Sequence, residues 1–211
     1  MQFHDRADAG RKLAKRLAKE RWSGPVFLFA LPRGGVATGA EIAKAMRLPL
    51  DVIVTRKLGA PHNPEYAVGS LAETGEVLWN PDEKRHLTKE QQQTVVDDET
   101  REMRRRIKTY RNGRPLRSLK GATALIIDDG IATGFTMRAA IAAARHQGAK
   151  EIVIAVPHGA KDTLTALRDE GCRVIALTEP ALYGAVGAYY DVFPQTTDDQ
   201  VITFLKDTSS V

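Results

Sequence analysis

Residues 124–136 read ALIIDDGIATGFT, an apolar run followed by two adjacent acidic residues and a short loop of glycines and threonines. The run extends over residues 122–127 without polar alternation, which predicts a strand buried on both faces of a parallel sheet. A helix is expected to begin near Phe135. Because ligands bind at the carboxyl ends of the strands in such sheets, this order of parts predicts a site for a phosphorylated sugar.

Two kinds of group define this predicted site. Asp128 and Asp129 follow the strand directly, and their carboxylates are suited to accept hydrogen bonds from the vicinal hydroxyls of a ribose. A neighbouring divalent cation would share their charge. Residues 130–136 turn into the helix, so backbone N–H groups and the hydroxyls of Thr133 and Thr136 converge where a helix N-terminus stabilises a 5′-phosphate. The alternative is an ordinary strand–turn–helix in which the glycine only makes the bend.

A second phosphate-binding turn is predicted near the N-terminus. The apolar strand expected at 26–30 runs into residues 31–35, LPRGG, and then into a helix expected over 36–46. The two glycines let backbone amides approach an anion closely, and the planar guanidinium of Arg33 offers paired donors to a phosphate. An ordinary strand–helix turn is again the alternative.

Residues 55–70, TRKLGAPHNPEYAVGS, follow a strand expected at 50–54. The segment is rich in proline and glycine, so we expect an irregular, mobile loop. Mobile loops that carry cations next to a phosphate site commonly close over the substrate and exclude water. Arg56 and Lys57 are the candidates for that role.

The segments LPRGG, RKLGAPHNPE and DDGIATG together resemble the type I phosphoribosyltransferases, and as a set they look closest to a bacterial group of predicted phosphoribosyltransferases. The apolar residues, the two acidic residues and the T-G-x-T loop of the family signature all match. The resemblance implies an α/β fold related to the Rossmann fold, with a parallel sheet covered by helices on both faces, a small irregular hood and a helical insertion.

The resemblance also implies an activity. The family transfers the 5-phosphoribosyl group of phosphoribosyl pyrophosphate to a nitrogenous base and releases pyrophosphate, with Mg²⁺ as cofactor. The RK-x-G-x-P pattern, and Ala132 where the 6-oxopurine branch generally has an aspartate, are similar to the adenine-using branch. A purine acceptor is therefore favoured.

Each candidate residue takes a role from the resemblance. Pyrophosphate would be held by a loop of Pro32, Arg33, Gly34 and Gly35, with a non-proline cis peptide next to Arg33. The 5′-phosphate would be bound by Gly130, Ala132, Thr133, Gly134, Phe135 and Thr136. The ribose, and Mg²⁺ mostly through water and pyrophosphate, would be bound by Asp128 and Asp129. The implied catalytic residues are Arg33, Arg56, Lys57, Asp129 and Glu65. Glu65 is the implied acid or base because the adenine-type loop also has a glutamate before a tyrosine, and a solvated loop carboxylate is the alternative.

An insertion is expected at about 71–120. It begins with a short strand predicted at 76–79 and contains a long helix predicted at 88–110. Thr88 and Gln91 have the spacing of a capping box at the start of that helix.

Two features of the insertion bear on partners. Met103, Ile107 and Tyr110 form a narrow apolar stripe on the predicted helix, which favours a homodimer. Residues 101–120 contain nine basic residues and one acidic residue. This basic stretch is a solvated helix face, a cluster that draws polyanionic substrates towards a site, or a nucleic-acid contact. In the last case the protein would be a regulator that binds phosphoribosyl pyrophosphate without turning it over.

A hood segment is expected at about 180–194. Four aromatic residues gather there: Tyr183, Tyr189, Tyr190 and Phe193. The resemblance implies that a hood covers the acceptor and stacks on its ring. Burial in the core is the alternative, and we favour it because aromatic clusters mostly bury apolar area.

Length and composition fit a single domain over residues 1–211. The 211 residues are 43% hydrophobic and 27% charged, an ordinary globular composition. No stretch approaches the roughly 18 apolar residues that span a membrane, and the charged first residues do not resemble a signal peptide. The single cysteine, Cys172, cannot form an intrachain disulfide, which suits a reducing cytoplasm. We therefore expect a cytoplasmic enzyme with no membrane partner.

Overall fold

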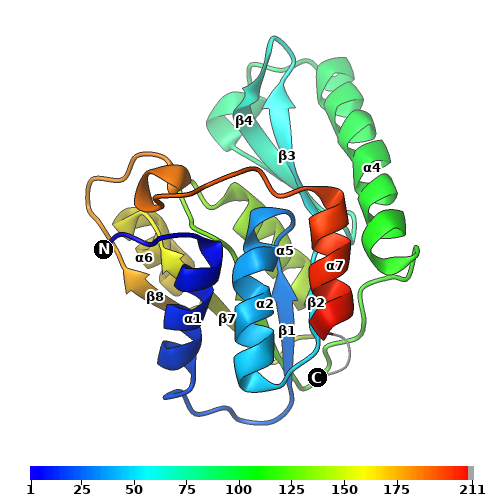
Figure 1. Cartoon of the computed structure of the whole chain (residues 1–211). Helices are drawn as coiled ribbons and strands as arrows, with labels where there is room; N and C mark the ends of the chain where they lie inside the picture. Colours follow the sequence, from blue (N-terminus) through cyan, green and yellow to red (C-terminus); the bar gives the residue numbers. More distant parts are fainter. Residues whose placement is uncertain (209–211) are drawn as a thin grey trace.

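The computed structural model describes residues 1–208, except for the side chain of Glu65. Five strands form a sheet in the order β2-β1-β6-β7-β8 (Figure 1). Their bounds are Leu50–Val52 for β2, Val26–Ala30 for β1, Thr123–Ile127 for β6, Glu151–His158 for β7 and Arg173–Thr178 for β8. Every neighbouring pair in this sheet is parallel. The predicted α/β class is confirmed.

Helices cover both faces of this sheet, as predicted. One face is covered by α1 (Arg6–Leu17), α2 (Gly34–Met46) and α7 (Asp198–Thr208), which stand in front of the sheet in Figure 1. The other face is covered by α5 (Phe135–His146) and α6 (Lys161–Asp169). The helix α7 was not predicted from the sequence.

Strand β6 shows why the central strands are apolar throughout. Leu125 and Ile127 belong to the core under α1, α2 and α7, whereas Ala124 and Ile126 belong to the core under α5 and α6. Successive side chains of a strand point to opposite faces. A strand that is covered on both faces therefore needs an apolar or small residue at every position, and all five residues of β6 are buried.

The segment predicted to be an irregular loop is regular, so that prediction was wrong. Residues Thr55–Ala60 form β3 and Asn63–Ala72 form β4, an antiparallel hairpin that β5 (Val77–Trp79) extends to a separate three-stranded sheet. The register shifts at Gly59, where a Cβ would lie only 2.4 Å from the carbonyl oxygen of Pro64. The glycine and proline residues therefore accommodate an irregularity and a turn within the hairpin and do not prevent strand pairing.

The predicted insertion contains a short helix, α3 (Pro81–Lys84), and a long one, α4 (Lys89–Arg111). The hydroxyl of Thr88 accepts a hydrogen bond from the backbone N–H of Gln91 at 3.2 Å, and the Gln91 side chain accepts one from the backbone N–H of Thr88 at 2.9 Å. The capping box and the long helix are confirmed. Helix α4 stands beside the hairpin at one side of the molecule (Figure 1).

The apolar stripe of α4 packs within the chain. Met103 and Tyr110 are buried in the core under α1, α2 and α7, and Ile107 is half-buried against it. Packing within the chain therefore accounts for most of this stripe without a second copy. The homodimer remains a prediction, as does the single domain.

The basic stretch 101–120 is not a uniform charged surface. Arg111 is buried and paired with the equally buried Glu73, which follows β4. Arg105 and Arg106 share one carboxylate, that of Glu102 on the same helix. Because Arg111 is buried, it cannot contact nucleic acid, whereas Arg105 and Arg106 are held by a carboxylate of their own helix.

Candidate functional site

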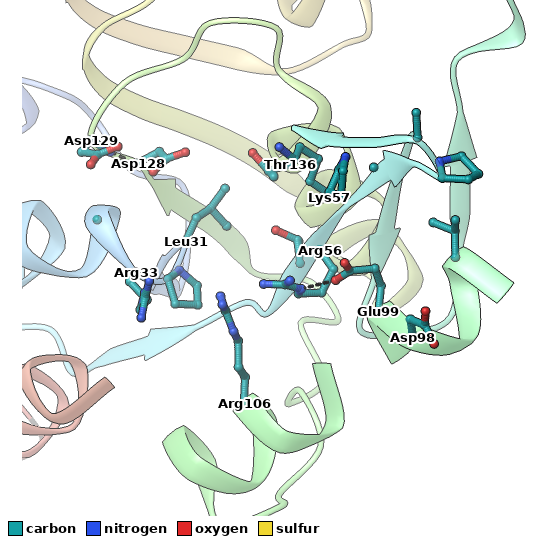
Figure 2. Close-up of a pocket in the computed structure, with 18 residues that line it drawn as sticks. Leu31, Arg33, Arg56, Lys57, Asp98, Glu99, Arg106, Asp128, Asp129 and Thr136 are labelled. Atoms are coloured by element: carbon teal, nitrogen blue, oxygen red, sulfur yellow. Dashed lines mark hydrogen bonds and ion pairs between the residues drawn. The ribbon is translucent and has the colours of Figure 1, made fainter. Parts of the chain in front are cut away.

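A cavity of about 590 Å³ lies at the carboxyl edge of the parallel sheet, between the ends of β1 and β6, the hairpin and α4 (Figure 2). Its volume lies within the roughly 300–1,000 Å³ typical of small-molecule sites. A second cavity of about 300 Å³ adjoins it, because Lys57, Asp128, Asp129 and Thr136 line both. All three segments that the sequence analysis identified therefore line these two adjoining cavities.

The turn after β1 contributes Pro32, Arg33 and Gly34 to the first cavity. The peptide between Pro32 and Arg33 is cis, as the resemblance implied, and α2 begins at Gly34, two residues earlier than predicted. A Cβ on Gly35 would lie 2.9 Å from the Cα of Asp128, closer than such atoms approach one another. Glycine is needed here because the turn after β1 packs directly on the turn after β6.

The adjacent carboxylates lie at the junction of the two cavities. The backbone N–H of Asp129 donates to Oδ1 of Asp128 at 2.9 Å. Burial raises the pKa of Asp128 well above its usual value, and the negative charge of Asp129 raises it further. Two carboxylates that repel one another in this way are suited to bind hydroxyl donors or a cation.

Arg6 is a partner of this pair that the sequence analysis missed. Its Nε donates to Oδ2 of Asp129 at 2.7 Å, and its Nη1 donates to the carbonyl oxygen of Pro194 at 2.6 Å. The guanidinium also lies 3.7 Å from the ring centroid of Phe193. Because 123 positions separate Arg6 from Asp129, no local pattern could have identified the contact.

The loop that follows Gly130 lines the second cavity and leads into α5. Gly134 precedes the helix with a φ of 76°, a conformation that favours glycine. Thr163 donates to the carbonyl oxygen of Ala132 at 2.7 Å, and Arg138 donates to that of Thr133 at 3.1 Å. Side chains of α5 and α6 thus fix the shape of the loop.

The hairpin and α4 form the opposite wall of the first cavity (Figure 2). Nε of Arg56 donates to Oε2 of Glu99 at 2.6 Å. Four α4 residues that the sequence analysis did not assign to a site line the cavity: Val95, Asp98, Glu99 and Arg106. The backbone of Glu65 lies in β4, but its side chain is outside the described part of the chain, so its role remains a prediction.

The aromatic residues of the 180–194 segment pack mainly on one another and on the N-terminus. Tyr190 is buried beside Phe3 and donates from its hydroxyl to the carbonyl oxygen of Asp129 at 2.5 Å. The four aromatic side chains of this segment are not among the residues that line the two cavities, whereas Val186 is. This favours the core-packing interpretation, and stacking on an acceptor remains a prediction.

His158, at the end of β7, is buried within the same aromatic cluster. Its Nδ1 lies 2.7 Å from the hydroxyl of Tyr183, and its ring centroid lies 4.3 Å from that of Tyr189. Burial lowers the pKa of His158 from 6.5 to about 4. A group whose pKa is lower in the folded than in the unfolded state takes up protons on unfolding. Its contribution to stability is therefore complete above about pH 6.5 and is lost as the pH falls towards 4.

The His158→Phe substitution is expected to make the melting temperature less sensitive to acid. Phenylalanine retains a planar ring for the aromatic stack but cannot be protonated, so the fall in Tm between pH 6.5 and 4 should be smaller than in wild type. Thermal unfolding at closely spaced pH values measures this, with the exposed His86→Phe as the control. Parallel pH curves for wild type and His158→Phe would contradict the assignment.

Fold and cavity together define a class of protein: the α/β proteins in which a glycine-rich turn, an acidic pair and a helix N-terminus surround one cavity at the carboxyl edge of a parallel sheet, as in the type I phosphoribosyltransferases. The chain belongs to this family. Residues 2–190 match the family described as the phosphoribosyl transferase domain.

Relatives agree with this membership. Two Mycobacterium tuberculosis proteins, "Putative phosphoribosyl transferase MT0597" of strain CDC 1551 and "Putative phosphoribosyl transferase Rv0571c" of strain H37Rv, are each 45% identical over 205 residues. The match covers 96% of this chain and 46% of each relative, so the chain spans about half their length. The crystal structure of TT1426 from Thermus thermophilus is 36% identical, with a TM-score of 0.81 over 99% of this chain and 100% of that one.

Two absences concern only residues 1–208. No helix among them is long and apolar enough to cross a membrane. With the side chain of Glu65 left out, these residues also contain no group of three or more histidine, cysteine, aspartate or glutamate side chains arranged to hold a metal ion.

Proposed function

We propose that the chain transfers the 5-phosphoribosyl group of phosphoribosyl pyrophosphate to a nitrogenous base, preferably a purine, and releases pyrophosphate. The observation that carries this proposal is the convergence of three segments on connected cavities. The turn at Arg33, the carboxylates of Asp128 and Asp129, and the loop of residues 130–136 come together there. Family membership supports the same reaction class.

Each segment has a proposed contact with the donor. The loop of residues 130–136 and the N-terminus of α5 would bind the 5′-phosphate through backbone N–H groups and threonine hydroxyls. Asp128 and Asp129 would accept hydrogen bonds from the ribose hydroxyls. The turn at residues 32–35, together with Arg56 and Lys57, would bind the pyrophosphate.

In the proposed reaction a ring nitrogen of the base attacks C1 of the ribose. The bond from C1 to the pyrophosphate oxygen breaks, and its electron pair leaves with pyrophosphate. The sugar passes through an oxocarbenium-like state, as in glycoside cleavage. The carboxylates would stabilise the positive ring, and Arg33, Arg56 and Lys57 the negative charge that develops on pyrophosphate. Glu65 is the proposed acceptor of a ring proton from the base.

The donor atoms of this site fit Mg²⁺. Asp128 and Asp129 are adjacent, and of the two only Asp129 has a guanidinium within hydrogen-bonding distance among the described residues. A divalent cation would relieve the repulsion that, in addition to burial, raises the pKa of Asp128. Mg²⁺ keeps several of its waters and takes phosphate oxygens, so two carboxylates are sufficient protein ligands. When bound, it would neutralise charge on the pyrophosphate.

We also propose the acceptor class, the cover over the acceptor, the cellular location and the oligomeric state. The purine preference rests on the RK-x-G-x-P pattern of the hairpin and on Ala132. The hood at about 180–194 would cover the acceptor. A cytoplasmic location rests on the single cysteine, and we propose one catalytic domain that forms a homodimer.

A pyrophosphate-release assay tests the proposed function. The protein is incubated with phosphoribosyl pyrophosphate and Mg²⁺ and with each of adenine, guanine, hypoxanthine, xanthine, uracil and orotate. We expect release with at least one purine. If no base leads to pyrophosphate release although the chain binds phosphoribosyl pyrophosphate with measurable affinity, the result would instead favour the donor-binding regulator. A gel shift at two salt concentrations would then test contact between residues 101–120 and nucleic acid.

A further inference from the structure

Helix α4 places one arginine of the basic stretch in the first cavity. Arg106 lines that cavity together with Arg33 and Arg56 (Figure 2). Its side chain is 14% exposed, so it is not a freely solvated cation of the helix surface. A solvated face or a nucleic-acid contact does not explain this position, whereas a cluster that draws polyanionic substrates towards a site agrees with it.

The hydrogen bonds of Arg106 leave its outer edge available. Its Nε donates to Oε1 of Glu102 at 2.8 Å. Hydrogen bonds from Arg105 and Arg106 lower the pKa of Glu102 to about 2, so this partner is ionised at neutral pH. Among the described residues, which leave out the side chain of Glu65, no side chain or carbonyl accepts a hydrogen bond from Nη1 or Nη2 of Arg106.

Arg56 has the same arrangement on the other side of the space. Its Nε donates to Glu99, and within the described residues its two terminal nitrogens also have no acceptor. In Figure 2 the guanidinium ends of Arg56 and Arg106 point towards one another, with Arg33 beside them. Carboxylates of α4 thus hold each guanidinium at Nε and leave the paired Nη donors, which match two phosphate oxygens, turned to the cavity.

We propose that Arg106 binds the pyrophosphate of the donor and the departing pyrophosphate product, as a third guanidinium beside Arg33 and Arg56. The inference rests on the proposed function, which it extends to a residue outside the segments that carry the family resemblance. When the bond from C1 to oxygen breaks, its electron pair moves to the pyrophosphate. The Nη1 and Nη2 groups of Arg106 donate hydrogen bonds to the oxygens on which that charge accumulates.

The experiment measures the affinity of the purified chain for inorganic pyrophosphate by calorimetry in the presence of Mg²⁺. Arg106→Met, which retains the aliphatic stem and the helix propensity, is expected to raise the Kd for pyrophosphate roughly tenfold. Arg106→Lys keeps the charge but loses the paired donors, so its affinity should lie between those of Arg106→Met and wild type. The control is Arg104→Met, an exposed arginine of the same helix that does not line the cavity.

The results distinguish the proposed role of Arg106 from the proposed function of the whole chain. Wild-type affinity for pyrophosphate in both Arg106 variants would overturn the role of Arg106 and leave the proposed function intact. Equal weakening in Arg104→Met would also overturn it, because any loss of helix charge would then have the same effect. If the wild-type chain binds neither pyrophosphate nor phosphoribosyl pyrophosphate, both proposals fail. Thermal unfolding of each variant establishes that it is folded. If Arg106→Met does not fold, the pyrophosphate affinity of Arg106→Lys is the decisive measurement.

Discussion

The Asp129→Asn substitution is expected to lower kcat/KM for phosphoribosyl pyrophosphate at least tenfold, about 1.4 kcal/mol of transition-state stabilisation. The amide loses the negative charge that would offset a positive ribose ring. It also presents an NH₂ group where a carboxylate now accepts hydrogen bonds. Initial rates of pyrophosphate release over a range of donor concentrations, with the acceptor identified by the screen, measure the effect.

Asp129 also has a partner within the chain, so the substitution has a second expected effect. Oδ2 of Asp129 accepts from Arg6 at 2.7 Å, so the substitution also weakens the contact with the N-terminal helix. A fall in melting temperature would report that loss, whereas a change in donor kinetics reports the ribose contact. The control is Asp169→Asn, an exposed carboxylate of α6 outside both cavities, which should leave the kinetics unchanged. Wild-type donor kinetics in Asp129→Asn would remove the assigned ribose contact.

The Arg111→Ala substitution is expected to lower the free energy of unfolding by about 3–5 kcal/mol, because it leaves a buried carboxylate without its counter-ion. The side chains of Arg111 and Glu73 are only 3% and 2% exposed. Glu73 also accepts from the backbone N–H of Val54 at 2.8 Å, and Arg111 donates to the carbonyl oxygen of Val52 at 3.3 Å. The pair therefore ties α4 to the segment between β2 and β3. Urea unfolding at neutral pH measures the loss.

Two further variants show whether burial is the cause. Arg101 pairs with Asp98 on the solvent-exposed surface of α4, so Arg101→Ala should cost no more than about 1 kcal/mol. Replacing both buried partners, as Arg111→Met with Glu73→Leu, should recover much of the stability because no charge is left unpaired. An equal loss in Arg101→Ala and Arg111→Ala would contradict the assigned role of the buried pair.

The pH dependence of Arg111→Ala follows from the same burial. Desolvation raises the pKa of Glu73 above its usual value even in the presence of Arg111. Without the arginine, the folded protein holds a proton on Glu73 more tightly than the unfolded chain does. The deficit relative to wild type should therefore be smaller near pH 5 and grow as the pH rises.

Much of the fold follows from local patterns in the sequence. The strand β1 has the predicted bounds, β6 begins one residue after the predicted start, and α5 begins at Phe135 as expected. These elements are predictable because burial on both faces requires a continuous apolar run, and because a glycine turn marks where the helix begins. The hairpin was missed because proline and glycine are common both in mobile loops and in the turns and irregularities of paired strands. Their presence in a short segment does not distinguish the two structures.

The amino-acid sequence by itself determined the class of fold, the family, and the three segments that meet at the carboxyl edge of the sheet. Each of these is encoded within a few consecutive residues, where burial periodicity and turn chemistry act. Only the tertiary structure decided that Arg6 pairs with Asp129, that Arg111 is buried against Glu73, and that Arg106 enters the cavity. These contacts join distant parts of the chain, and a charged side chain has the same local sequence signal whether it is solvated, buried in a pair or turned towards a site.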